Sequence, residues 1–263
     1  MKQNDLFEMK QNDLFNLKAK KKIAMLTCYD FQTAKLLEQA GIDLILVGDS
    51  LGMVVLGFND TKSVTMADMV RHTAAVARAV EKTPVVGDLP AGSYDSVEDS
   101  LKNAKLLMEA GANAIKFEGC KSEIVSALVK EKIPVMAHLG LLPQTAKKYC
   151  IQGLKENEAE KIFNDAMTLD KLGVFAIVLE CIPLSLAKKI TENTNALTIG
   201  IGAGPHCNGQ VLVINDLLGL NQKFKPKFVK QYTNLSEEII KAVSSFRTEV
   251  LNGKFPLDKE SFH

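Results

Sequence analysis

Two short apolar runs of the chain each end in glycine followed by aspartate. Residues 44–47 lead into Gly48, Asp49 and Ser50, and residues 84–86 lead into Gly87 and Asp88. Hard divalent cations prefer carboxylate oxygens, so two aspartates that emerge together predict a site for such an ion. In the alternative interpretation each aspartate only caps the helix that follows it. The sequence by itself leaves these two interpretations about even.

Other apolar segments end in side chains suited to acid–base chemistry or anion binding. Lys116 and Glu118 are two residues apart, so they point to the same side of a strand, and their apolar neighbours favour a functional role. Glu180 ends a long apolar run, where a carboxylate can act as a base near neutral pH. An exposed, inert glutamate fits that position nearly as well. His138 either bonds an anionic substrate or satisfies buried backbone groups.

These residue types together predict a particular chemistry. A divalent cation, a lysine for an anionic group and a glutamate base would suit a chelating 2-oxo acid. The cation would withdraw electrons from the carbonyl and hold the enolate, while the base removes the adjacent proton. Cys120 and Cys181 have no obvious activating histidine in sequence, so a thiolate nucleophile is disfavoured.

The elements that must position these residues alternate between strands and helices. Repeats of strand, polar exit, helix and glycine are typical of parallel βαβ units. Eight such units favour an α/β fold, a closed (β/α)8 TIM barrel with parallel strands, whose catalytic face is built from strand ends. No G-x-G-x-x-G follows the first strand, which argues against a dinucleotide-binding fold. The predicted strands are residues 23–28, 44–50, 84–88, 113–118, 133–138, 174–180, 197–202 and 211–214.

One barrel domain is predicted over residues 23–263, after an N-terminal extension of residues 1–22. Residues 1–7 recur as residues 9–15, and both an amphipathic helical lid and a duplicated chain start fit this copy. Residues 51–63 are predicted as a glycine-rich loop, long enough to fold over a site.

Composition excludes several classes of function. With 263 residues, 46% of them hydrophobic, the chain can bury a sizeable core, and its net charge of +1 gives no global reason for a nucleic-acid or membrane partner. The five cysteines are odd in number and lack C-x-x-C spacing, which predicts free thiols in a reducing cytosol. No apolar run approaches the roughly 18 residues of a membrane span, and the N-terminus is too charged for a signal peptide. We therefore expect a cytoplasmic protein.

Several longer motifs lie at the predicted strand ends. They are Val47-Gly-Asp-Ser-Leu-Gly-Met53, Gly87-Asp-Leu-Pro90, Ile115-Lys-Phe-Glu-Gly119, Ala137-His-Leu-Gly-Leu-Leu-Pro-Gln144 and Leu179-Glu-Cys-Ile-Pro183. In content, order and spacing they resemble the ketopantoate hydroxymethyltransferase family. The similarity covers about residues 16–263.

The resemblance implies a (β/α)8 barrel that is usually a decamer of identical subunits. It implies transfer of a hydroxymethyl group from 5,10-methylenetetrahydrofolate to 3-methyl-2-oxobutanoate, giving 2-dehydropantoate in the first step of pantothenate biosynthesis. Carried over by position, Asp49 and Asp88 would bind one Mg²⁺ per subunit, and Glu118 would complete the metal site directly or through water. Glu180 would be the proton acceptor. The residues around the oxo acid would be Asp49, Ser50, Asp88, Lys116 and His138.

Some positions depart from the family pattern, and three alternatives compete with this interpretation. Ala91, Gly92, Asn208 and Asn215 stand where other residues are usual, which affects folate binding and subunit contacts more than the chemistry. The alternatives are a lyase acting on a related oxo acid, an enzyme that uses Lys116 as a Schiff base, and an inactive barrel kept for binding.

Overall fold

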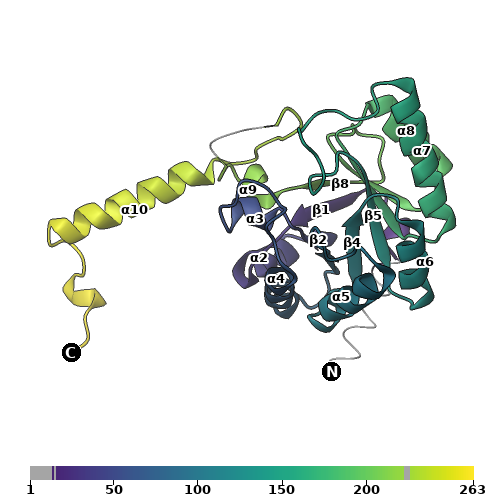
Figure 1. Cartoon of the computed structure of the whole chain (residues 1–263). Helices are drawn as coiled ribbons and strands as arrows, with labels where there is room; N and C mark the ends of the chain where they lie inside the picture. The colour runs from purple at the N-terminus through teal and green to yellow at the C-terminus, as the bar shows by residue number, and fades with distance from the viewer. Residues whose placement is uncertain (1–13, 15, 222–225) are drawn as a thin grey trace. The chain divides into compact units, whose positions relative to one another are not determined.

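The computed structural model describes residue 14 and residues 16–221 and 226–263, and its strands form a closed barrel (Figure 1). Every strand is parallel to its neighbours and pairs with them in chain order, and β8 returns to pair with β1. The predicted (β/α)8 barrel is confirmed. The strands are β1 (Ile23–Thr27), β2 (Leu44–Val47), β3 (Val85–Asp88), β4 (Ala114–Glu118), β5 (Val135–Gly140), β6 (Ala176–Glu180), β7 (Leu197–Ile201) and β8 (Gly209–Leu212).

Amphipathic helices connect the strands. In α4 the buried residues Met69, Thr73 and Val76 recur at helical spacing, and Thr65 and Asp68 form a capping box at its start. The helices are α2 (Phe31–Gln39), α3 (Leu51–Val54), α4 (Met66–Ala79), α5 (Val97–Glu109), α6 (Ser122–Lys130), α7 (Glu156–Lys171), α8 (Leu184–Asn193), α9 (Ile214–Leu217) and α10 (Leu235–Leu251), with short 3₁₀ helices η1 (Leu17–Ala19) and η2 (Asp258–Glu260). None of the described helices is long and apolar enough to cross a membrane.

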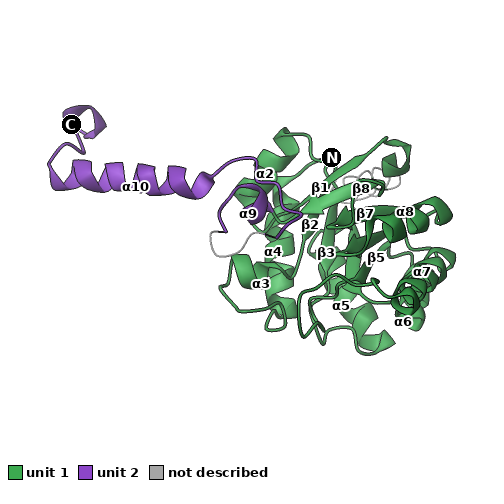
Figure 2. Cartoon of the chain, turned by 90° about the horizontal axis from the view of Figure 1, so that it is seen from above, with its two compact units in different colours: residues 1–213 green, residues 214–263 purple. Residues whose placement is uncertain are grey.

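The chain forms two compact units, residues 1–213 and residues 214–263 (Figure 2). The first contains every strand of the barrel, and the second contains α9, α10 and η2. The duplicated N-terminal segment lies outside the described residues except for Leu14. Leu14 and Leu17 are buried in the barrel core, so at least these two residues of the predicted extension belong to the packed structure.

Apolar side chains that alternate along the strands fill the barrel interior. The core cluster includes Val86 on β3, Ala114 on β4, Met136 on β5 and Val178 on β6. Side chains two residues apart on a strand point to the same side, so the next inward position on each of these strands lies above this apolar floor. Those next positions are Asp88, Lys116, His138 and Glu180.

The structure corrects the prediction for the eighth strand. The apolar run 211–214 is too late, because β8 begins at Gly209 and ends at Leu212, and Ile214 already belongs to α9. Gly209 pairs with Ile23 of β1, and a Cβ at Gly209 would lie 2.7 Å from the Ile23 carbonyl oxygen. Closure of the barrel therefore requires glycine at position 209. A prediction based on apolar runs misses this start of the strand, because glycine has no apolar side chain.

The predicted loop of residues 51–63 also differs, because it opens with helix α3. Leu51 is fully buried, and the Val54 N–H donates to the Ser50 carbonyl oxygen at 3.1 Å. Gly52 usually disfavours a helix. Here a Cβ at Gly52 would lie 2.6 Å from a methyl carbon of Val64, so close packing explains the glycine.

Gly140 at the end of β5 generates a stability prediction. Its φ is +93°, and a Cβ there would lie 2.2 Å from the Glu180 carbonyl oxygen. We expect Gly140→Ala to lower the free energy of unfolding by about 3 kcal/mol or more, because backbone strain and a backbone clash combine. Gly41→Ala is the matched control, since Gly41 has φ +76° and no atom within 4 Å of its added Cβ; it should cost about 1–2 kcal/mol. Urea unfolding measures both, and equal losses would contradict the clash.

Candidate active site

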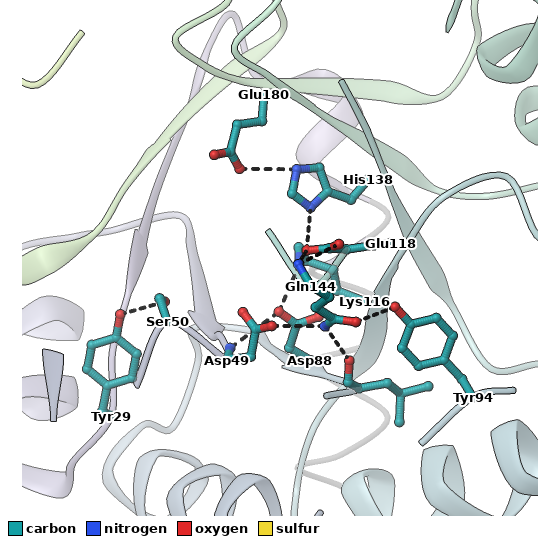
Figure 3. A network of polar contacts seen from close by, with 11 residues as sticks. Tyr29, Asp49, Ser50, Asp88, Tyr94, Lys116, Glu118, His138, Gln144 and Glu180 are labelled. Atoms are coloured by element: carbon teal, nitrogen blue, oxygen red, sulfur yellow. Dashed lines mark hydrogen bonds and ion pairs between the residues drawn. The ribbon is translucent and has the colours of Figure 1, made fainter. Parts of the chain in front are cut away.

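The carboxyl ends of β3, β4 and β5 assemble a buried polar layer (Figure 3). Asp88 pairs in register with Lys116, and Glu118 pairs with His138. All four residues are at most 5% exposed. Both Lys116 and Glu118 are buried on β4, in agreement with the prediction that they point to the same side of a strand.

A buried ion pair lies at the centre of this layer. Lys116 Nζ is 2.8 Å from Asp88 Oδ2. Burial by itself would lower the pKa of Lys116, but the carboxylates of Asp88, Asp49 and Glu118 raise it, so the ammonium group stays charged. A lysine that forms a Schiff base must lose its proton, and this environment therefore disfavours the Schiff-base alternative.

The layer contains more carboxylates than cations. Burial raises the pKa of Asp88 to about 7, against the opposing effect of Lys116, and Asp49 raises it further. Burial also raises the pKa of Glu118 to about 9, with Asp49 and Asp88 adding to the shift. A buried excess of negative charge is costly, so protons or a bound cation must offset it.

The donor set fits a hard divalent cation. Asp88 Oδ1 is buried and has no hydrogen-bond partner in the described part of the chain, which leaves this oxygen for a ligand. Among the described residues, no three His, Cys, Asp or Glu side chains converge as a ready coordination cluster. Mg²⁺ commonly binds through one or two carboxylates and keeps several waters, so this arrangement suits it.

The interpretation that both aspartates only cap helices is wrong. Asp88 ends β3, and the next helix, α5, is capped by Ser96 instead. The Asp49 carboxylate accepts a hydrogen bond from Gln144 Nε2 at 2.9 Å, and Ser50 occupies the N-cap position of α3. Both carboxylates therefore belong to the polar layer.

His138 lies between Glu180 and Glu118 (Figure 3). Its Nε2 is 3.1 Å from Glu180 Oε2, and its Nδ1 is 3.9 Å from Glu118 Oε1. Burial lowers the pKa of His138, and the charge of Lys116 lowers it further, so the imidazole is neutral near pH 7. The Glu180 side chain is 17% exposed, so its carboxylate lies beside the histidine at the edge of the buried layer.

The remaining predicted residues lie around this network. The Tyr29 hydroxyl and Ser50 Oγ are 2.9 Å apart, beside Asp49 in the chain. Burial raises the pKa of Cys181 to about 11 and also raises that of Cys120, in agreement with the prediction that neither thiol is the nucleophile.

Sequence reasoning gave no role to two residues of the network, Gln144 and Tyr94. The Gln144 N–H donates to Glu118 Oε2 at 3.1 Å, and the Tyr94 hydroxyl donates to Gln144 Oε1. Both residues lie several positions after the end of a strand. A search limited to polar residues directly after the predicted strands therefore misses them. The only signal in the sequence was a polar side chain, Gln144, directly after the apolar segment Leu141-Leu142-Pro143.

A comparison of the sequence with models of known protein families shows to which family this chain belongs. The model described as ketopantoate hydroxymethyltransferase matches residues 8–258. The chain belongs to the ketopantoate hydroxymethyltransferase family. A relative from Thermoanaerobacter sp. (strain X514), named 3-methyl-2-oxobutanoate hydroxymethyltransferase, is 51% identical over 249 residues, covering 92% of this chain and 91% of the relative. Relatives of the same name from Moorella thermoacetica and Ignicoccus hospitalis are each 52% identical, covering 92% and 90% of this chain and 93% and 92% of their own lengths.

Solved structures show the same fold at low sequence identity. Phosphonopyruvate hydrolase, solved in complex with oxalate and Mg²⁺, superposes with a TM-score of 0.66 at 14% identity, covering 97% of this chain and 92% of that one. The 2,3-dimethylmalate lyase of the PEP mutase/isocitrate lyase superfamily gives 0.64 at 14% identity, with coverage of 97% and 92%. These similarities place this member of the ketopantoate hydroxymethyltransferase family in a widely used barrel fold.

The raised pKa of Glu118 generates a pH prediction. Between the unfolded pKa of about 4.3 and the folded pKa of about 9, the folded protein keeps a proton that the unfolded chain loses. Without metal, the free energy of unfolding should therefore fall as pH rises through this window, by at most about 1.4 kcal/mol per pH unit from this group.

Urea unfolding in EDTA between pH 5 and 8, run on the wild type and on Glu118→Gln, measures this slope. Glu118→Gln should lose the part of the pH dependence of the free energy of unfolding that comes from Glu118. Glu123→Gln is the control, because Glu123 lies on the exposed surface of α6, and it should keep the wild-type slope. Parallel pH dependences for the wild type and Glu118→Gln would show that Glu118 does not hold this proton.

Proposed function

We propose that this chain transfers a hydroxymethyl group from 5,10-methylenetetrahydrofolate to 3-methyl-2-oxobutanoate, giving 2-dehydropantoate, the first step of pantothenate biosynthesis. The named activity of its relatives supports this substrate. The observation that carries the proposal is that the buried Lys116–Asp88 ion pair and Glu180, which lies 3.1 Å from His138, are at the same end of the barrel.

The charged groups provide for binding the oxo acid. The Lys116 ammonium keeps its positive charge in a buried position and can attract the anionic end of the substrate. Ser50 Oγ, near the Tyr29 hydroxyl, can donate or accept a hydrogen bond. We assign Asp49, Ser50, Asp88, Lys116 and His138 to the surroundings of the oxo acid.

Glu180 is the proton acceptor in this proposal. The hydrogen on C3 of the oxo acid is acidified by the neighbouring carbonyl, and a positioned carboxylate can remove it. His138 is neutral, and its Nε2 lies 3.1 Å from Glu180 Oε2, so the base has a polar neighbour and no positive charge beside it. The carbon that loses the proton then forms the new bond to the one-carbon unit. The two bonds from that unit to the folate nitrogens break, water supplies the hydroxyl group, and tetrahydrofolate leaves.

Asp49 and Asp88 would hold the Mg²⁺, and Glu118 would complete the site directly or through water. When bound, the ion would polarise the substrate carbonyl and offset the buried negative charge. Phosphonopyruvate hydrolase has the same fold and was solved with Mg²⁺ and oxalate, so the fold is compatible with such a site. The assignment to this chain rests on its own carboxylates.

Two further properties belong to this proposal. We propose a homo-oligomer, a decamer as the family resemblance implies. We also propose that the protein works in the reducing cytosol, where its cysteines remain thiols.

The test is the complete reaction. Glu180→Gln keeps the size of the side chain but removes the base, so its turnover number should fall by about 10²–10⁴-fold, measured as 2-dehydropantoate formed from both substrates with Mg²⁺. Glu192→Gln is the control, because Glu192 lies exposed on α8, which directly follows β6; it should retain the wild-type rate. Turnover of Glu180→Gln close to wild type would contradict the assignment of the base.

A further inference from the structure

Gln144 connects two carboxylates of the polar layer. It is only 5% exposed, and its backbone N–H donates to Glu118. Its side-chain Nε2 donates to Asp49 Oδ2 at 2.9 Å and to the Leu89 carbonyl oxygen at 3.0 Å (Figure 3). An amide nitrogen carries two hydrogens, so this arrangement uses both.

The Tyr94 hydroxyl favours this orientation of the amide. It donates to Gln144 Oε1, and burial raises the pKa of Tyr94, so the hydroxyl keeps its proton. If the amide turned round, Oε1 would face the carboxylate of Asp49 and the carbonyl of Leu89, and neither can donate. The bond from Tyr94 and the two acceptors therefore select the same orientation.

Tyr94 is itself held by the barrel. Its ring contacts that of Phe117 on β4, with 5.4 Å between centroids, and Lys121 Nζ lies 5.0 Å from its centroid. The preceding residue is also fixed, because Asn103 of α5 donates to the Ser93 carbonyl oxygen at 2.7 Å. The hydroxyl thus has a defined position before any ligand binds.

We propose that Tyr94 is a positioning residue for the cation site: its hydroxyl fixes the Gln144 amide, and the amide holds the Asp49 carboxylate in the orientation that binds a divalent cation. This inference rests on the proposed function, because it takes Asp49 as a metal ligand. Hydrogen-bond partners behind a ligand orient it and tune the affinity of the site. Tyr94 would contribute through Gln144 and would touch neither the cation nor the substrate.

Mg²⁺ binding to the full chain without substrate tests this proposal, by isothermal titration calorimetry at fixed pH. Tyr94→Phe keeps the ring and its packing but removes the hydroxyl, and we expect its Kd for Mg²⁺ to rise about tenfold. Tyr232→Phe is the control. It removes the same hydroxyl from an exposed tyrosine whose ring lies beside Lys230, so its Kd should stay at the wild-type value.

A double-mutant cycle shows whether Tyr94 acts through Gln144. Gln144→Ala should weaken Mg²⁺ binding at least as much as Tyr94→Phe, and the double variant should bind no more weakly than Gln144→Ala, because the hydroxyl has no amide left to orient. In turnover assays, Tyr94→Phe should need about tenfold more Mg²⁺ for half-maximal rate. Its rate at saturating Mg²⁺ should remain close to that of the wild type.

Three results would overturn the inference: an unchanged Kd in Tyr94→Phe, an equal loss in Tyr232→Phe, or additive losses in the double variant. Each would leave the proposed metal site intact, because the wild type would still bind Mg²⁺. A wild type that binds no Mg²⁺ would instead overturn both this inference and the metal part of the proposed function.

Discussion

The buried ion pair between Lys116 and Asp88 is the constraint on which the rest of the site depends. It lies above an apolar floor, with both side chains nearly inaccessible to solvent. Charges in such a position are stable only when they are paired and hydrogen-bonded. Asp49 and Glu118 lie close by, so one lysine cannot neutralise the negative charge of the layer. A bound proton or cation must compensate the remainder.

This constraint explains how the titratable groups can have different tasks. The carboxylates nearest Lys116 are the most buried, and burial shifts the pKa of Glu118 to about 9 and that of Asp88 to about 7. Glu180 lies one strand further round the barrel, is partly exposed and faces a neutral His138. The buried groups are thereby suited to bind charge, and Glu180 is suited to move a proton.

Much of the fold and part of the site could be predicted from the sequence. Alternation along a strand was enough to place Lys116 and Glu118 on one inward face, because a parallel barrel strand leaves few alternatives for a charged residue among apolar ones. The same reasoning failed at Gly209, where barrel closure selects a residue without a side chain. It also gave no role to Gln144 and Tyr94, because the contacts of residues in connecting segments depend on which segments meet across the barrel. Family resemblance supplied the substrates, which the residue types alone narrowed only to a 2-oxo acid.

The most direct test of the account is proton exchange at C3 of 3-methyl-2-oxobutanoate, followed by proton NMR in D₂O with the full chain and Mg²⁺ but no folate. The account predicts that the methyl doublet collapses as deuterium replaces the C3 proton. It also predicts that exchange is lost in Glu180→Gln and on chelation of the metal, and that it persists in Glu192→Gln. Exchange that continues undiminished in Glu180→Gln would contradict the claim that Glu180 is the base.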